Sequence, residues 1–398
     1  MIEVKPDIQQ QSNCPHCKTP LKDYNLIWQG MHVLTASKCI KCHANIIEDL
    51  KVGHGRNFSY QVDIEKNLLF GDEASKVWLG KPLIESLKNP KNQELKITKE
   101  IIKTHKQVII LNCIDFLYGH SLLKLLNAQK YIDKYPEYGL VVIVQKFMRW
   151  MVPSGVAEIW TVDIPLREGR SYYLKFHEFV SQEIQRFDNV CVSKAYSHPK
   201  DFDISRFTGV PQHNFTEELP KITFVWREDR VWVNNLLYRV LKKLGLQTIS
   251  LFIQNIKIIS LFTYIRYLLP SAKFKITGLG SKTKFPSWIE DGRVEKFDKD
   301  TEIKICKIYS DSRLVIGIHG SNMLLPSAHA GMTIDLMPKD RWGNFAQDIL
   351  YQEKDPRFAA FRYRYLPISL QRNQIAEIAV SMITKYPNFI LDMTVEEQ

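Results

Sequence analysis

The ten residues 314–323 constrain the fold of this chain more than any other segment. A run of apolar, largely β-branched residues ends at His319 and Gly320, and an apolar segment of helical character follows. A second short apolar run at 332–337 closes at Pro338. This order of strand, turn, helix and strand is typical of a parallel α/β domain. Ligands of open α/β sheets bind at the carboxyl ends of the strands, so we expect the chemistry at this turn.

The same alternation of strands and helices runs through two long segments of the chain. The first has predicted strands at 108–113, 140–144, 158–162 and 189–193, with helices at 120–131 and 173–187. The second has predicted strands at 222–226, 247–251, 273–277, 293–297, 314–318 and 332–337, with helices at 232–244, 256–268 and 301–309. Such alternation predicts parallel sheets with helices on both faces. The predicted fold class is α/β, with two Rossmann-like, doubly wound domains facing a cleft.

Four of the seven cysteines form two C-x-x-C pairs near the N-terminus: Cys14, Cys17, Cys39 and Cys42. Each pair can offer two thiolates to one tetrahedral metal ion, and the spacing is that of a zinc ribbon. His16 or His43 could replace a ligand, although four cysteines suffice. The alternatives are disulfides, which need an oxidising compartment, and a redox C-x-x-C, which normally occurs once beside a βαβ unit. We predict a structural zinc ion with no open coordination position.

The length of 398 residues suggests two or three domains. The predicted organisation is a zinc-ribbon-like module at 1–50, a connector packed on the next domain at 51–105, an N-terminal Rossmann-like domain at 106–200, a linker at 201–220, a C-terminal Rossmann-like domain at 221–380, and a C-terminal helix and tail at 381–398. The linker is placed where prolines and polar residues interrupt the alternation of strands and helices.

The net charge of +11 favours anionic partners. The sequence has no uncharged apolar run of about 18 residues and no charged-then-apolar segment at its start. We therefore expect no membrane span and a cytoplasmic chain. Because the basic residues form no long block, we predict phosphorylated small ligands and peripheral contact with the inner face of a membrane, rather than a nucleic-acid groove.

The turn after residue 318 is the first candidate site. Gly320 permits close backbone approach, Ser321 or Asn322 can cap the following helix, and free N–H groups there can bind a phosphate. His319 lies between two glycines at the end of a strand, which favours a ligand-binding role. A helix cap beside a partly buried histidine is the alternative interpretation.

The turn after the predicted strand 222–226 is the second candidate. Arg227 and Arg230 could contact a diphosphate there. A local ion-pair cluster with Glu228 and Asp229 is the alternative.

Two further candidate sites follow strands, and each contains an aspartate. Asp115 and His120 lie in the turn after strand 108–113. A histidine at a helix N-terminus stays neutral and can accept a proton, although an ordinary cap and turn would also explain these residues. Asp335, at the end of the last strand, could hold a ribose or sugar hydroxyl, and a solvated loop is the alternative there.

The segment 315–338 resembles the pattern of glycosyltransferase family 61. In that pattern a strand enters His-Gly-Ala/Ser-Gly-Leu, and a small-residue helix and a strand ending in an acidic residue and proline follow. Asn322 stands where the family usually has glycine, and Asp335 stands where it usually has glutamate. The resemblance implies a GT-B fold, in which this region belongs to the nucleotide-sugar domain.

The resemblance also implies a function and roles for the candidate residues. The donor site would be lined by His319, Gly320 and Ser321, with Arg227 near the diphosphate. Asp115 or His120 would deprotonate the acceptor hydroxyl of a glycan, lipid-linked saccharide or protein, in glycan or glycoconjugate synthesis of bacterial type. We expect no catalytic metal, because positive side chains and helix dipoles would stabilise the leaving diphosphate.

Three other functions fit parts of the sequence. Another nucleotide-sugar enzyme, such as an epimerase, could use the same two domains. A zinc ribbon with basic charge could bind nucleic acid, in which case binding would depend steeply on salt. A scaffold with a degenerate site is the third, because Asn322 occupies a glycine position.

Overall fold

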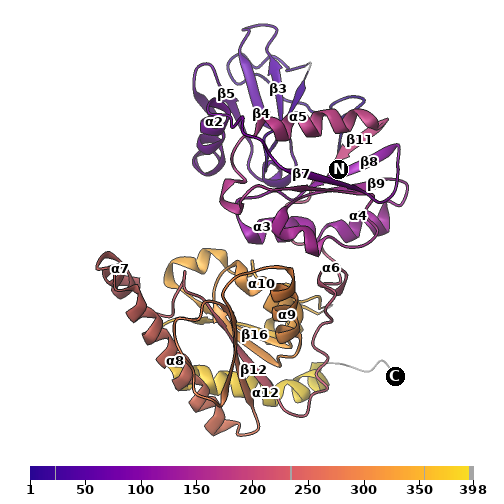
Figure 1. Cartoon of the computed structure of the whole chain (residues 1–398). Helices are drawn as coiled ribbons and strands as arrows, with labels where there is room; N and C mark the ends of the chain where they lie inside the picture. Colours follow the sequence, from indigo (N-terminus) through magenta and orange to yellow (C-terminus); the bar gives the residue numbers. More distant parts are fainter. Residues whose placement is uncertain (23, 234, 354, 394–398) are drawn as a thin grey trace. The chain divides into compact units, whose positions relative to one another are not determined.

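The computed structural model describes residues 1–22, 24–233, 235–353 and 355–393 (Figure 1). The chain divides into two compact units, Met1–Phe202 and a second unit that begins at Asp203. Each unit has a central sheet and a hydrophobic core of its own. The division lies at the start of the predicted linker. Residues 394–398 of the predicted tail lie outside the described residues.

The central sheet of the first unit has four parallel inner strands and two antiparallel edge strands among the described residues. Its order is β1 (Ile2–Lys5), β11 (Asn189–Val192), β8 (Gln107–Asn112), β9 (Gly139–Gln145), β10 (Glu158–Val162) and β7 (Ile97–Ile101). Every residue of β9 is buried, as expected for a strand covered on both faces. The inner strands nearly coincide with the predicted ones, because long apolar runs mark them in the sequence.

A second, antiparallel sheet in this unit follows the chain order. Its strands are β2 (Asn25–Trp28), β3 (Val33–Lys38), β4 (Asn45–Asp49), β5 (Tyr60–Asp63) and β6 (Leu68–Gly71). Trp28 and Leu34 of this small sheet share one hydrophobic core with Val108 and Val141 of the central sheet. The N-terminal segment therefore differs from a separate module, since it packs into the first unit and its β1 extends the central sheet.

The segment 51–105 also differs from the predicted connector. It contains β5, β6, β7, α1 (Glu73–Ser75) and α2 (Lys81–Lys88), and β4 pairs with β5 across the predicted boundary at residue 50. These strands have four or five residues each, and the side chains of β7 are largely exposed. Short edge strands lack the apolar run by which a buried strand is identified in a sequence.

The turn between β2 and β3 contacts the segments that follow β8 and β10. The Asn112 side-chain amide donates a hydrogen bond to the carbonyl oxygen of Gly30 at 2.7 Å, and the Met31 amide donates to that of Gly169 at 3.1 Å. A Cβ on Gly169 would lie 2.2 Å from the carbonyl oxygen of Asp115. Glycine is therefore required where these backbones meet at the carboxyl edge of the sheet.

The sheet of the second unit is parallel throughout its described strands. Its order is β14 (Ile289–Val294), β13 (Lys273–Leu279), β12 (Lys221–Trp226), β15 (Leu314–Ile318), β16 (Met332–Met337) and β17 (Tyr363–Pro367). Numbered along the chain, this is the order 3-2-1-4-5-6 of the doubly wound fold. The order reverses between β12 and β15, and ligands of such sheets bind at the carboxyl ends of the strands at this point.

Helices connect the strands of both units. The first unit contains α3 (Tyr118–Leu125), α4 (Ala128–Lys134) and α5 (Leu174–Glu183), and the second contains α6 (Ser205–Thr208), α7 (Asn235–Lys243), α8 (Gln247–Leu268), α9 (Lys299–Ser310), α10 (Leu324–His329), α11 (Pro356–Arg362) and α12 (Arg372–Met393). Helices α8 and α12 pack against each other in the second unit.

Two strand predictions in the second unit are corrected by the structure. The strand predicted at 247–251 is wrong, because these residues form the first turns of α8. A short apolar run does not distinguish a strand from a buried helix by periodicity alone. The strand predicted at 293–297 lies earlier, as β14, and most of its side chains are not buried.

We expect Gly169→Ala to lower the free energy of unfolding of the first unit by about 1–3 kcal/mol, because the added Cβ would overlap the carbonyl oxygen of Asp115. Urea denaturation measures this change. The matched control is Gly343→Ala, where no atom lies within 4 Å of the added Cβ and the change should stay below about 0.5 kcal/mol. Equal unfolding free energies for Gly169→Ala and the unsubstituted protein would contradict the prediction.

Candidate functional site

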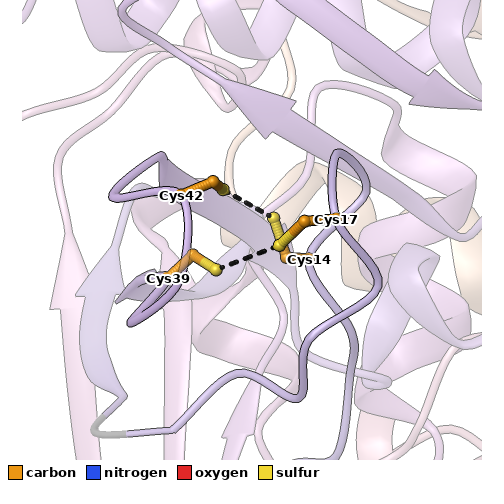
Figure 2. Close-up of side chains that lie close together, drawn as sticks. All are labelled: Cys14, Cys17, Cys39 and Cys42. Atoms are coloured by element: carbon orange, nitrogen blue, oxygen red, sulfur yellow. Dashed lines mark hydrogen bonds between the residues drawn. The ribbon is translucent and has the colours of Figure 1, made fainter.

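The four cysteines of the C-x-x-C pairs point toward one another from two loops (Figure 2). The Sγ atoms of Cys14 and Cys42 are 3.5 Å apart, as are those of Cys17 and Cys39. All four Sγ atoms lie within 4.8 Å of one another, and all four cysteines are free of disulfides. Metal–sulfur bonds of about 2.3 Å place the sulfurs of a tetrahedral site about 3.8 Å apart. The four thiols therefore have the spacing of a tetrahedral metal site.

The two cysteine pairs have the same backbone turn. The Lys18 amide donates to the carbonyl oxygen of Cys14 and the His43 amide to that of Cys39, both at 2.9 Å. Lys18 and His43 have left-handed φ angles of 61° and 63°. Hydrogen bonds with Thr19 lower the pKa of the Cys17 thiol, which favours the thiolate that metals bind, whereas desolvation and the neighbouring thiols raise the pKa of Cys42. The four-cysteine cluster can therefore hold a metal ion.

His319 directly follows β15 and is held by two buried carboxylates. Its Nδ1 lies 3.0 Å from Oδ2 of Asp335 and 2.9 Å from Oδ2 of Asp348. The Tyr363 hydroxyl donates a hydrogen bond to the same Oδ2 of Asp335 at 2.8 Å. All four residues are buried. The ring of His319 is therefore fixed from β16, β17 and the segment between them.

The carboxylates keep His319 charged. Burial lowers its pKa, but the hydrogen bond with Asp335 and the negative charge of Asp335 and Asp348 outweigh burial and raise the pKa to about 9. Burial raises the pKa of Asp335, and the interaction with His319 offsets part of that rise. Nδ1–H of the imidazolium is directed at the carboxylates. Nε2–H, on the other side of the ring, has no hydrogen-bond partner among the described residues. This N–H can donate to an anionic ligand.

Two arginines from the turn after β12 reach the backbone beside His319. Arg227 hydrogen-bonds the side-chain oxygen of Asn322, and Arg230 hydrogen-bonds the carbonyl oxygen of His319. A Cβ on Gly320 would lie 2.7 Å from a guanidinium nitrogen of Arg230 and 2.8 Å from one of Arg227, and its φ is 144°. The φ angle favours glycine at this position, and the absence of a Cβ lets both guanidinium groups approach the backbone.

The two arginines differ in their ion pairs. Arg227 pairs with Asp229 through nitrogen–oxygen distances of 2.9 and 2.6 Å. Within the described part of the chain, Arg230 has no carboxylate at ion-pair distance, and burial together with the charge of Arg227 lowers its pKa. Two cations therefore lie at the carboxyl ends of β12 and β15: the imidazolium of His319 and the guanidinium of Arg230, which has no carboxylate at ion-pair distance among the described residues. Such a group of cations binds phosphate or another anion.

The remaining residues predicted for this site differ in their exposure to solvent. Ser321 is exposed and Asn322 is partly buried. Asp335, predicted near a ribose or sugar hydroxyl, is buried and contacts His319 instead. The helix predicted after Gly320 is a 3₁₀ turn followed by the six residues of α10. Because these helices are so short, the side chains rather than a helix dipole supply the positive charge.

In the first unit, the carboxylate of Asp115 is completely occupied. Its Oδ2 lies 2.7 Å from Nε2 of His54 and 2.9 Å from Nζ of Lys124. Its Oδ1 accepts hydrogen bonds from the amides of Phe116 and Leu117 at 2.9 and 3.1 Å. Asp115 therefore has no oxygen atom left for a substrate.

His120 borders this cluster in the first turn of α3. Its Nδ1 lies 3.4 Å from Nε2 of His54 and 3.7 Å from Oδ1 of Asp115. The rings of Trp78 and Tyr196 flank it, with centroids 6.1 and 6.0 Å away. The His120 side chain is 25% exposed, whereas those of His54 and Asp115 are fully buried. Of the two catalytic residues predicted in this unit, His120 is the one that a substrate can reach.

Burial makes both histidines of this cluster neutral. It lowers the pKa of His54 to about 3, and the hydrogen bond with Asp115 offsets only part of this shift. Burial also lowers the pKa of His120. Burial opposes ionisation of Asp115, but Lys124 and His54 hold the pKa of this carboxyl well below its usual range. A neutral histidine beside a buried ion pair can accept a proton, and burial rather than a helix dipole keeps His120 neutral.

Four residues of these clusters are missed by the sequence patterns: His54, Lys124, Asp348 and Tyr363. His54 lies between Gly53 and Gly55, and flanking glycines are the signal that also marks His319. A Cβ on Gly55 would lie 2.4 Å from the carbonyl oxygen of Leu50. No local signal distinguishes the other three from ordinary charged or aromatic residues.

The chain was compared with known proteins. No protein-family model matches it, and no curated protein matches it. Among solved structures it is similar to ADP-heptose LPS heptosyltransferase II from E. coli, with a TM-score of 0.39 and 9% identity over 71% of this chain and 99% of that chain. A likeness this weak carries no argument about fold or function. The resemblance of 315–338 to glycosyltransferase family 61 therefore stays a prediction.

We expect the purified protein to hold about one zinc ion per chain, and Cys14→Ser/Cys39→Ser to lose it. Because the small sheet shares the core of the first unit, metal loss should also lower that unit's melting temperature. Elemental analysis and thermal unfolding measure the two effects. Cys191→Ala, which changes a cysteine outside the cluster, should keep the metal. A metal-free protein after expression with zinc would contradict the prediction.

We expect His319 to titrate near pH 9 in the folded protein, against 6.5 for an ordinary histidine. A raised folded-state pKa stabilises the fold fully below pH 6.5, and this contribution is lost as the pH rises through about 9. Asp335→Asn should lower the pKa of His319. NMR of labelled histidines measures it, with His329, whose burial lowers its pKa to about 4, as a neutral reference. An unchanged His319 pKa in the variant would contradict this assignment.

Proposed function

We propose that the chain is a glycosyltransferase of GT-B type, which transfers a sugar from a nucleotide-sugar donor to a hydroxyl acceptor. The observation that carries the proposal is the meeting of Arg227, Arg230 and His319 at the carboxyl ends of β12 and β15. A doubly wound sheet with this strand order binds the phosphates of nucleotides at this reversal point. The resemblance of 315–338 to glycosyltransferase family 61 supports the same donor class.

In the proposed reaction, the bond between the anomeric carbon and the diphosphate oxygen breaks, and negative charge develops on the leaving diphosphate. Nε2–H of His319 and the guanidinium of Arg230 would donate hydrogen bonds to its phosphate oxygens. Asp335 and Asp348 keep the imidazolium charged and oriented. We expect this positive charge to serve without a catalytic metal. Arg227, which Asp229 already pairs, would contribute less.

The acceptor would be held by the first unit, with His120 as the base. His120 is partly exposed and its pKa is lowered, and both properties suit a group that accepts a proton from a hydroxyl. That oxygen would then attack the anomeric carbon of the donor sugar. Asp115, whose carboxylate is fully occupied, would orient His54 and balance the charge of Lys124. The acceptor class stays as predicted: a glycan, a lipid-linked saccharide or a protein.

The four-cysteine cluster would hold a structural zinc ion in this proposal. All four ligand positions of a tetrahedral ion are filled by thiolates, so that no position is open to a substrate. The cluster belongs to the small sheet, whose β2–β3 turn contacts the segment after β8. The zinc would therefore stabilise the support of the acceptor site and take no part in transfer.

We expect the protein to bind a nucleoside diphosphate, and Arg230→Gln and His319→Gln each to weaken binding by about 10- to 100-fold, because each removes a charged donor. Isothermal titration with a panel of nucleoside diphosphates measures this. The matched control is Arg357→Gln, an exposed arginine paired with Asp355, which should bind normally. Absence of nucleoside diphosphate binding, or equal binding by all three variants, would overturn the proposed donor site.

Transfer itself is tested with His120→Gln, which should bind the nucleoside diphosphate normally but lower kcat by about 10²- to 10⁴-fold. Product analysis with and without an acceptor separates a transferase from an epimerase, since an epimerase converts the donor without an acceptor. Normal turnover in His120→Gln would exclude this residue as the base and leave the donor site standing.

A further inference from the structure

Helices α7 and α8 follow each other along the chain in the second unit (Figure 1), and both expose large apolar side chains. Seven large apolar side chains, each between 43% and 65% exposed, form what we term the α7–α8 surface: Leu237, Val240, Leu244, Leu246, Ile249, Phe252 and Ile256. Exposed apolar residues that occur singly are common, but contiguous ones mark a site of interaction.

The exposed apolar residues follow helical spacing on both helices. On α7 and its end they recur at 237, 240 and 244, and on α8 at 249, 252 and 256. Both sets have the intervals i, i+3 and i+7, which place side chains on one face of a helix. On α8 the opposite side is occupied by buried residues, including Leu251 and Ile258, whereas on α7 the buried Leu241 lies beside the exposed stripe and the opposite side carries Arg239 and Lys242. Helix α8 thus has one apolar side toward the core and an apolar stripe toward solvent, and the apolar side of α7 is largely exposed.

The stretch of sequence that contains this surface has charged residues of a single sign. From Val231 to Ile289 the sequence has nine lysines and arginines and no aspartate or glutamate, against a net charge of +11 for the chain. Two of the nine, Lys275 and Lys282, pair with acidic residues outside this stretch. Arg239, Lys242 and Lys243 of α7 are exposed. An apolar stripe on a helix that also carries exposed cations is the pattern of a helix that lies in the interface of an anionic bilayer.

Helix α8 is long and apolar enough to cross a membrane by length and composition alone. Its contacts show instead that it packs against the core of the second unit. Gln254 accepts a hydrogen bond from the Trp232 amide at 2.8 Å and donates to the carbonyl oxygen of Arg227 at 2.9 Å. Ile258 and Phe262 are fully buried in the core of the unit. Insertion across a bilayer would break these contacts, whereas shallow contact through the solvent-facing stripe leaves them intact.

We propose that the α7–α8 surface docks the second unit on a membrane that contains anionic lipids. The apolar side chains would enter the boundary between headgroups and acyl chains, and the cations of α7 would contact the lipid phosphates. The exposed cations of α7 match an anionic lipid surface more closely than they match a second copy of this surface, which would meet them with like charge. The inference rests on the exposed residues of α7 and α8 and does not depend on the proposed function.

Vesicle co-sedimentation with the full chain tests the proposal. The protein should bind vesicles of equal parts phosphatidylcholine and phosphatidylglycerol, bind phosphatidylcholine alone more weakly, and dissociate as salt rises from about 0.1 to about 1 M. Lys242→Gln/Lys243→Gln should weaken binding about 10- to 30-fold. Leu244→Ser/Phe252→Ser should weaken it at least about 10-fold on both kinds of vesicle, because apolar burial does not depend on lipid charge.

Matched controls alter equally exposed residues elsewhere. Ile102→Ser/Phe297→Ser changes side chains that are 61% and 53% exposed, and Lys106→Gln/Lys296→Gln changes lysines that are 88% and 83% exposed. Both controls should bind vesicles normally. The proposal is overturned if the unsubstituted protein stays in solution with anionic vesicles or if the controls lose binding equally. Self-association that Leu244→Ser/Phe252→Ser abolishes, without vesicle binding, would assign the surface to a second copy of the chain.

Discussion

Buried charges at the carboxyl edges of the two sheets need partners, and this requirement arranges the elements around them. Asp115 is held by Lys124 from α3, by His54 from the short segment after β4, and by two backbone amides. His319 is held by carboxylates from β16 and from the segment after it. Removing one member would leave an unpaired buried charge, which costs about 3–5 kcal/mol. The helices and loops near each sheet edge are therefore fixed by the same side chains that could perform chemistry.

The two clusters lie at the carboxyl edges of their sheets, after β8 in the first unit and after β15 in the second, and differ in charge. The inner strands of the first unit run in the order β10, β9, β8 and β11, so that β8 and β11 correspond to β12 and β15 of the second unit. In the first unit a lysine neutralises the carboxylate and two histidines are neutral. In the second unit the histidine is charged and arginines surround it. The turn after the first inner strand thus carries a proton acceptor, His120, in the first unit and two arginines of the anion site, Arg227 and Arg230, in the second.

Strands with a long apolar run could be predicted from the sequence, whereas short or partly polar strands could not. The strands around Val141 and Ile316 are buried on both faces, and long apolar runs identify them. Strand β7 and the small antiparallel sheet escape because their strands are short and partly exposed. The first turns of α8 imitate a strand because Ile249 and Leu251 alternate with polar residues, as they would in a half-buried strand. His319 and Asp335 are identified separately by their turns, but nothing local predicts that they pair, or that Asp348 joins them.

Hydrophobic periodicity and C-x-x-C spacing are local properties of the chain, so the α/β class, the parallel inner strands and the four-cysteine cluster could be predicted from the sequence. The sequence also identified His120, His319, Arg227 and Arg230 as residues that follow strands. Their protonation, in contrast, depends on the tertiary structure. Burial and partners distant in sequence make His120 neutral and His319 charged, since a pKa depends on what surrounds a group in space and not on its neighbours along the chain.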